Sequence, residues 1–199
     1  MKRSMKKLGV FVIIAAIAIF ISTATATAGD KDPKKTIKGD YAFTGEGFCI
    51  SSPSGFNPNL TPMDGWFFQS FNVQGVWTFN HDGTGSRQGR SVIVTLISPP
   101  VSLPSASSMD FQASFTYTIG PDDTITTQLS SPLTGQMLTG PRTGQTFTID
   151  QIVLTGMISK DNKSLTIATD EPQIETVTFS DGFVEHRICH RARVLLRLE

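Results

Sequence analysis

Apolar and polar residues alternate with a period of two along most of the chain, and this pattern limits the possible folds more than any other feature. Between residues 70 and 80 one parity carries Phe71, Trp77 and Phe79, while the other is mostly Ser, Asn, Gln and Thr. The alternation returns between Phe111 and Ile119. Because successive side chains of a strand point to opposite faces, each segment predicts a strand with one buried and one solvated face.

Turn sequences separate the alternating segments at short intervals. The Asp-Gly steps at Asp82 and Asp181 favour β-hairpins. No stretch beyond residue 28 combines apolar residues at helical spacing with helix caps. Ten strands are predicted, at 40–50, 66–80, 84–98, 109–120, 123–130, 133–139, 145–158, 163–169, 172–180 and 183–198.

The N-terminal segment has the features of a secretory signal peptide. Four basic residues, Lys2, Arg3, Lys6 and Lys7, precede an apolar run from 8 to 21, shorter than the about 20 residues that span a bilayer. Ala26 and Ala28 are the small residues that signal peptidase accepts, so we predict cleavage after Ala28; an uncleaved membrane anchor is the alternative.

The predicted cleavage defines the domain organisation. We predict a signal peptide at 1–28, a flexible lead-in at 29–37 and a single β-barrel domain at 38–199. The mature protein is then secreted or periplasmic, with no stable membrane insertion after cleavage. A membrane-spanning β-barrel is disfavoured by Pro99-Pro100, by short strands such as 163–169 and by the charged C-terminus.

Removal of the signal peptide changes the net charge. The chain has 17 Lys and Arg, and the loss of four leaves 13 against 17 Asp and Glu, a net charge of −4. A nucleic-acid-binding surface needs an excess of basic residues to displace counterions from phosphates. We therefore expect no nucleic-acid partner.

Cys49 and Cys189 are the only two cysteines, and they lie near opposite ends of the mature chain. In an oxidising compartment such a pair predicts a structural disulfide. The bond would make the first and last strands neighbours. Together with the hairpin pattern, it predicts an all-β fold: a single antiparallel up-and-down barrel of about 8–10 strands with adjacent N- and C-terminal strands.

The last predicted strand, 183–198, has two distinct faces. Its even positions are largely apolar and include His186 and His190, whereas its odd positions include Arg187, Arg191 and Arg193. The apolar parity of the other strands favours an inward even face and a solvated odd face. In the alternative, a wide and wet barrel, the three arginines would line the interior and bind a carboxylate or another anion.

No recognised catalytic, cofactor or metal motif occurs in the chain. Motifs such as G-x-S-x-G, H-E-x-x-H, C-x-x-C and a glycine-rich phosphate loop are missing. His186 and His190 would stand about 13 Å apart on a strand, too far to share one metal ion without a third element. We predict no catalytic residue, no metal and no cofactor, and favour a protein that is not an enzyme.

Two segments resemble the small secreted lipocalin-like (calycin) barrels of bacteria. They are Gly39-Asp40-Tyr41-Ala42-Phe43 and Trp77-Thr78-Phe79-Asn80-His81-Asp82-Gly83-Thr84-Gly85. The resemblance implies an up-and-down barrel that holds a small hydrophobic ligand, with the long first loop, Ser51–Gly65, over its mouth. The predicted ligand-binding residues are Tyr41, Phe43, Phe71, Trp77, Phe115, Tyr117, His186 and His190.

The sequence leaves three functions open. The first is a secreted binding module, whose interior aromatic residues either fill the barrel or leave room for a hydrophobic ligand. The second is an isomerase or cyclase that uses the barrel cavity, with His186 or His190 as the polar group in an apolar pocket. The third is a structural or surface-interaction protein with a Thr-rich and Ser-rich exterior and no ligand.

Overall fold

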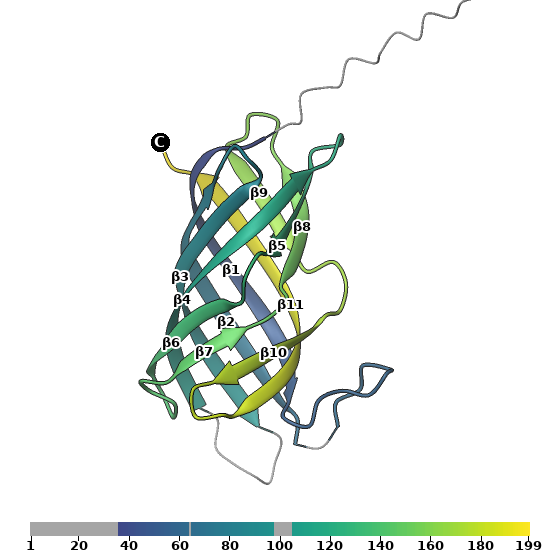
Figure 1. The fold of residues 1–199 in the computed structure, drawn as a ribbon, viewed down its shortest axis with the longest axis vertical. Coiled ribbons are helices and arrows are strands. Elements are labelled where there is room, and N and C mark those ends of the chain that lie inside the picture. The colour runs from purple at the N-terminus through teal and green to yellow at the C-terminus, as the bar shows by residue number, and fades with distance from the viewer. Residues whose placement is uncertain (1–35, 64, 98–104) are drawn as a thin grey trace, which may run out of the picture. The chain divides into compact units, whose positions relative to one another are not determined.

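The computed structural model describes residues 36–63, 65–97 and 105–199, which belong to one compact unit. The predicted signal peptide and residues 29–35 of the lead-in lie outside this part, as do residues 98–104. Among the described residues no helix is long and apolar enough to cross a bilayer. The strands are β1 Gly39–Ser52, β2 Phe67–Phe79, β3 Thr84–Ile97, β4 Ser105–Ile119, β5 Thr124–Leu129, β6 Leu133–Thr139, β7 Thr146–Ile149, β8 Val153–Ile158, β9 Ser164–Ala168, β10 Ile174–Phe179 and β11 Val184–Arg197 (Figure 1).

All strand pairs are antiparallel and close into a ring, which confirms the predicted up-and-down barrel. Three pairs of strands, β5–β6, β7–β8 and β9–β10, each act as one interrupted strand. At one end the ring runs β1-β2-β3-β4-β5-β8-β9-β11 and returns to β1. At the other end it runs β1-β2-β3-β4-β6-β7-β10-β11 (Figure 1). Both circuits therefore contain eight strands.

The first and last strands form the longest-range pairing in the ring. Their register runs from Tyr41 opposite Arg197 to Ser52 opposite His186. Cys49 lies directly opposite Cys189, and the two form a disulfide across 140 positions of sequence. The predicted disulfide and the predicted adjacency of the terminal strands are both confirmed.

The interruptions occur where the backbone cannot continue a regular ladder. Pro132 lies between β5 and β6, and Pro172 between β9 and β10; proline has no N–H to donate to a neighbouring strand. Between β7 and β8, Gln151 has a φ of 40°, a conformation that leaves the extended region. The prediction of one strand over 145–158 is therefore wrong.

Interior glycines lie opposite aromatic residues of the neighbouring strand. Gly47 pairs with Phe71, and Gly85 with Phe115. A Cβ at either glycine would overlap the ring of its partner. Small barrels fill their interior by this kind of alternation between small and large residues. The glycines therefore make room for aromatic side chains inside the ring.

Aromatic residues fill the end of the ring that contains β5, β8 and β9. Trp77 and Phe115 lie with their ring centroids 4.7 Å apart, and Phe79 packs against both. The hydroxyl of Tyr41 donates to the carbonyl of Asn162, and the single O–H of Tyr117 is shared between the carbonyls of Ile37 and Asn80. The tyrosines thus tie the core to the turns at this end and to the last residues of the predicted lead-in.

Candidate functional site

The odd positions of β11 face the interior, so the prediction that its even face points inward is wrong. Glu185, Arg187, Cys189, Arg191, Arg193 and Leu195 are all buried. The even positions Val194, Leu196 and His190 are exposed. β11 therefore presents charged groups to the barrel interior. This agrees with the alternative prediction from the sequence, in which the arginines of this strand line the interior.

Glu175 of β10 is the centre of a buried ionic cluster. Its Oε2 accepts hydrogen bonds from Nε of Arg187 at 3.1 Å and from Nη2 of Arg191 at 2.6 Å, and its Oε1 accepts one from Nη1 of Arg191. Burial alone would raise the pKa of Glu175, but Arg191 and Arg187 hold this pKa below its ordinary value. The carboxylate is therefore charged and bound by two cations at neutral pH.

Arg87 and Arg193 have no such counter-ion in the part of the chain that the structure describes. Their side chains are 3% and 6% exposed. Nε and Nη2 of Arg87 and Nε and Nη1 of Arg193 find no hydrogen-bond partner among the described residues. Instead, their guanidinium carbons lie 5.0 and 6.0 Å from the ring centroid of Trp77, which provides cation–π contacts. Two buried cations are thus held by an aromatic ring without a neutralising carboxylate.

The burial of these cations lowers their pKa. Desolvation lowers the pKa of Arg87 to about 9; the positive charge of Arg191 adds to this effect and Glu175 opposes it. Desolvation, followed by Arg87 and Arg191, also holds the pKa of Arg193 well below its usual range. Both shifts mean that burial destabilises the charged form of these side chains, so a nearby negative charge would stabilise it.

A pocket of about 280 Å³ lies inside the ring at the end that contains β6, β7 and β10. We call this pocket the outer chamber. Its wall is mainly apolar and reaches Arg142 in the β6–β7 turn. Its other polar members are Gln69, Thr95, Ser105, Ser107, Glu185 and Arg187. Its apolar wall includes Ile93, Met109, Met137, Phe147, Ile149, Val177 and Phe179.

A smaller space of about 30 Å³ adjoins the outer chamber deeper in the ring. Five residues line both spaces: Gln69, Ile93, Met109, Ile149 and Arg187. The smaller space, the inner chamber, is also lined by Arg191 and Arg193. The interior therefore passes from the outer chamber near one end to a small chamber whose mostly apolar wall includes three arginines.

The six predicted aromatic ligand-binding residues all occupy inward-facing positions, but most belong to the filled core. Tyr41, Phe43, Trp77, Phe115 and Tyr117 are buried and line neither chamber. Phe71 is partly buried and lines the inner chamber.

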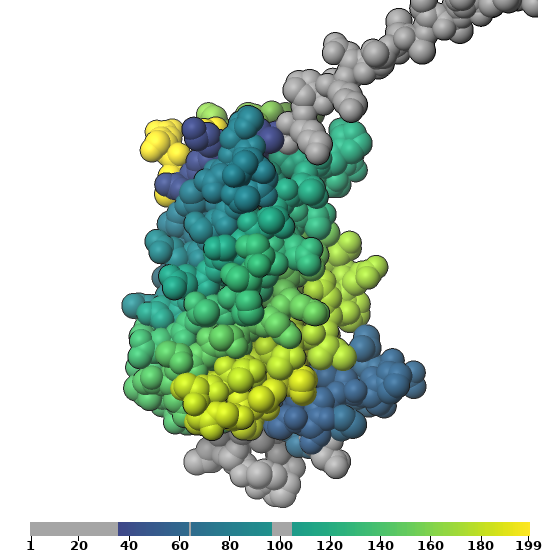
Figure 2. All heavy atoms as spheres, viewed as in Figure 1, coloured from purple at the N-terminus to yellow at the C-terminus, as the bar shows by residue number. Residues whose placement is uncertain are grey.

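The two predicted histidines lie on the outer face of β11. His190 is exposed, and His186 is half-buried with its Nδ1 3.4 Å from the hydroxyl of Thr176. The predicted mouth loop also lies outside the ring. The blue region that projects at the lower right of Figure 2 belongs to this loop. Gly55 is buried next to the His186 ring, and no described residue between 53 and 66 lines either chamber. Neither the histidines nor this loop contributes to the interior site.

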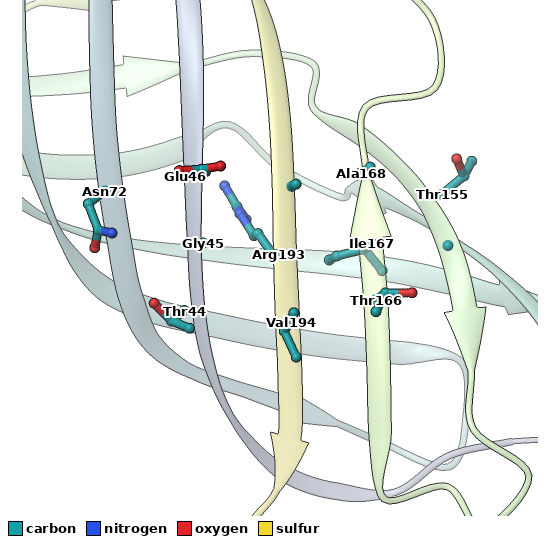
Figure 3. Close-up of a pocket in the computed structure, with 12 residues that line it drawn as sticks. Thr44, Gly45, Glu46, Asn72, Thr155, Thr166, Ile167, Ala168, Arg193 and Val194 are labelled. Atoms are coloured by element: carbon teal, nitrogen blue, oxygen red, sulfur yellow. The ribbon is translucent and has the colours of Figure 1, made fainter.

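A groove of about 470 Å³ on the outer surface crosses β1, β8, β9 and β11. Figure 3 shows Arg193 extending from β11 towards β1, next to Gly45. A Cβ at Gly45 would lie 2.6 Å from Cγ of Arg193. The glycine therefore leaves room for the buried arginine. The groove is lined by a mixture of polar residues, including Thr44, Glu46 and Thr166, and small or apolar ones, including Ala192 and Val194.

Comparison with known proteins gives no family for this chain. No protein-family model matches it, and no curated protein is significantly similar to it. The fold and the interior define a closed antiparallel β-ring with one filled end, one chambered end and a buried arginine cluster between them.

Glu185, the second buried carboxyl, is expected to destabilise the protein at neutral pH. Burial raises its pKa, against the opposing effects of Arg187, Arg142 and a hydrogen bond from Ser51. Because the folded-state pKa of Glu185 is above the ordinary value of 4.5, its neutral carboxyl supports the folded state fully below pH 4.5. This stability is lost as the pH rises through the folded-state pKa. Glu185→Gln should therefore raise the thermal midpoint at pH 7, and the difference should disappear below about pH 4.5.

Thermal unfolding of both proteins across this pH range tests the expectation. Glu171→Gln, at an exposed position between β9 and β10, is the matched control. A lower midpoint for Glu185→Gln at pH 7 would show instead that the charge of Glu185 is stabilised by its arginine neighbours.

Proposed function

We propose that this protein is an extracytoplasmic binding protein that holds a small hydrophobic ligand inside its barrel, in the manner of lipocalin-like proteins. The observation that carries the proposal is the outer chamber, a mainly apolar space at one end of a ring whose other end is filled. Ligand sites are typically concave, mostly apolar and supplied with a few polar groups, and their volumes begin near 300 Å³. A volume of about 280 Å³ suits a compact ligand.

The disulfide supports the proposed secretion of the protein. Disulfides persist in oxidising compartments and are rare in the cytosol. The cyclase alternative required a histidine in the interior, and both candidate histidines are on the outer face, so we do not propose it. We likewise do not favour a purely structural role, because a packed barrel needs no apolar chamber.

The proposal is tested with a neutral apolar fluorophore, N-phenyl-1-naphthylamine, which brightens in apolar surroundings. We expect saturable binding with one site per chain. Ser107→Trp, inside the outer chamber, should abolish it, whereas Ala106→Trp, exposed on the opposite face of the same strand, should not. Equal binding by both variants would place the fluorophore outside the chamber, and no binding by the unmodified protein would contradict the proposal.

A further inference from the structure

The barrel interior has more buried positive charge than its own carboxylates neutralise. Its buried ionisable side chains are Arg87, Arg187, Arg191 and Arg193 against Glu175 and Glu185. Glu175 is already bound by Arg187 and Arg191. A buried charge is among the costliest groups in a protein unless it is paired and hydrogen-bonded. Arg87 and Arg193 therefore indicate a negative group that the described residues do not supply.

Arg193 is the unpaired arginine that an entering ligand would meet. It lines the inner chamber, whereas Arg87 does not. Its guanidinium carbon lies 5.7 Å from the Phe43 ring centroid and 6.0 Å from that of Trp77. These rings fix the side chain without using its N–H groups. Arg193 is thus a positioned hydrogen-bond donor at the end of an apolar path.

We infer that the barrel binds a small apolar carboxylic acid, with the carboxylate in the inner chamber against Arg193 and the hydrocarbon part in the outer chamber. This inference rests on the proposed ligand-binding function. The inner chamber, about 30 Å³, is close to the volume that one water molecule occupies in the liquid, so it suits a small polar group such as a carboxylate and is too small for a hydrocarbon chain. A guanidinium binds a carboxylate through two parallel N–H···O bonds. The apolar wall of the outer chamber suits a hydrocarbon tail.

Three probes separate the parts of this inference: octanoate, 1-octanol as the tail without charge, and acetate as the charged head without a tail. Calorimetric titration should give octanoate an affinity about tenfold or more above that of octanol, because a hydrogen bond to a charged group contributes that much. Acetate should bind far more weakly than either. Arg193→Met should remove the preference for octanoate and leave octanol binding unchanged.

Arg90→Met is the matched control, since Arg90 is exposed on the outer face of β3; it should retain the preference for octanoate. Arg193→Met should also leave the thermal midpoint of the ligand-free protein unchanged or higher, because it removes an unpaired buried charge. Retention of the octanoate preference by a folded Arg193→Met variant would contradict the inference.

The outcomes distinguish this inference from the proposed function. Equal binding of octanoate and octanol would overturn the carboxylate preference while the apolar site remained supported. If acetate bound as tightly as octanoate, the site would be one for very small anions only, and the inference would be overturned. No binding of octanol or octanoate would contradict both proposals. The comparison of probes on the unmodified protein decides these points even if Arg193→Met fails to fold.

Discussion

Reduction of the Cys49–Cys189 bond should lower the free energy of unfolding by about 5 kcal/mol. The bond joins positions 140 residues apart, and in the chain-entropy model a closed loop of this length restricts the unfolded chain by about that amount. The folded ring should persist, because backbone hydrogen bonds pair β1 with β11 along their whole length. We therefore expect a native far-ultraviolet circular dichroism spectrum for the reduced protein and a much lower urea midpoint.

The double variant Cys49→Ala with Cys189→Ala separates the bond from the reducing agent. Its urea midpoint should match that of the reduced protein, and addition of a reductant should not change it further. Equal midpoints for oxidised and reduced unmodified protein would contradict the prediction. They would mean that the strand pairing around Cys49 holds the chain ends together in the unfolded ensemble as well.

The alternation of residues was sufficient to predict most of the ring. In β2 and β4 one parity is apolar, so both the strand and its buried face follow from the sequence. The break at Gln151 was not predicted, because β7 and β8 read as one continuous strand. Gln151, with its positive φ, directly follows Asp150. The Oδ1 of Asp150 accepts a hydrogen bond from the backbone N–H of Thr176 at 2.5 Å. That contact joins residues far apart in the sequence.

The inward face of β11 was harder to predict, because both of its faces carry a consistent pattern. Apolar side chains lie on its outer face, and the charges on its inner face find their partner, Glu175, on another strand. One signal was nevertheless available. Directly paired residues of antiparallel strands point to the same side, and Cys49 shares parity with the buried Tyr41 and Phe43. Its disulfide partner Cys189 therefore had to face inward, and Arg191 and Arg193 with it.

The replacement Glu175→Gln should destabilise the protein by about 3–5 kcal/mol at neutral pH, the usual cost of removing one partner from a buried ionic cluster. Arg187 and Arg191 would both lose the carboxylate that now accepts their hydrogen bonds, and the interior would then hold four cations and only Glu185. The urea midpoint at pH 7 measures the effect, with Glu185→Gln as the control expected to change stability in the opposite direction.

Acidification should reveal the same interaction in the unmodified protein. The folded-state pKa of Glu175 is below its ordinary value of 4.5, so its contribution to stability is complete above that value and is lost as the pH falls through the folded pKa. The stabilities of unmodified protein and Glu175→Gln should therefore converge only in strong acid. A Glu175→Gln variant as stable as the unmodified protein at pH 7 would mean that the arginine cluster does not need this carboxylate. In that case water rather than protein would solvate the interior charges, and the inner chamber would extend further than its lining residues indicate.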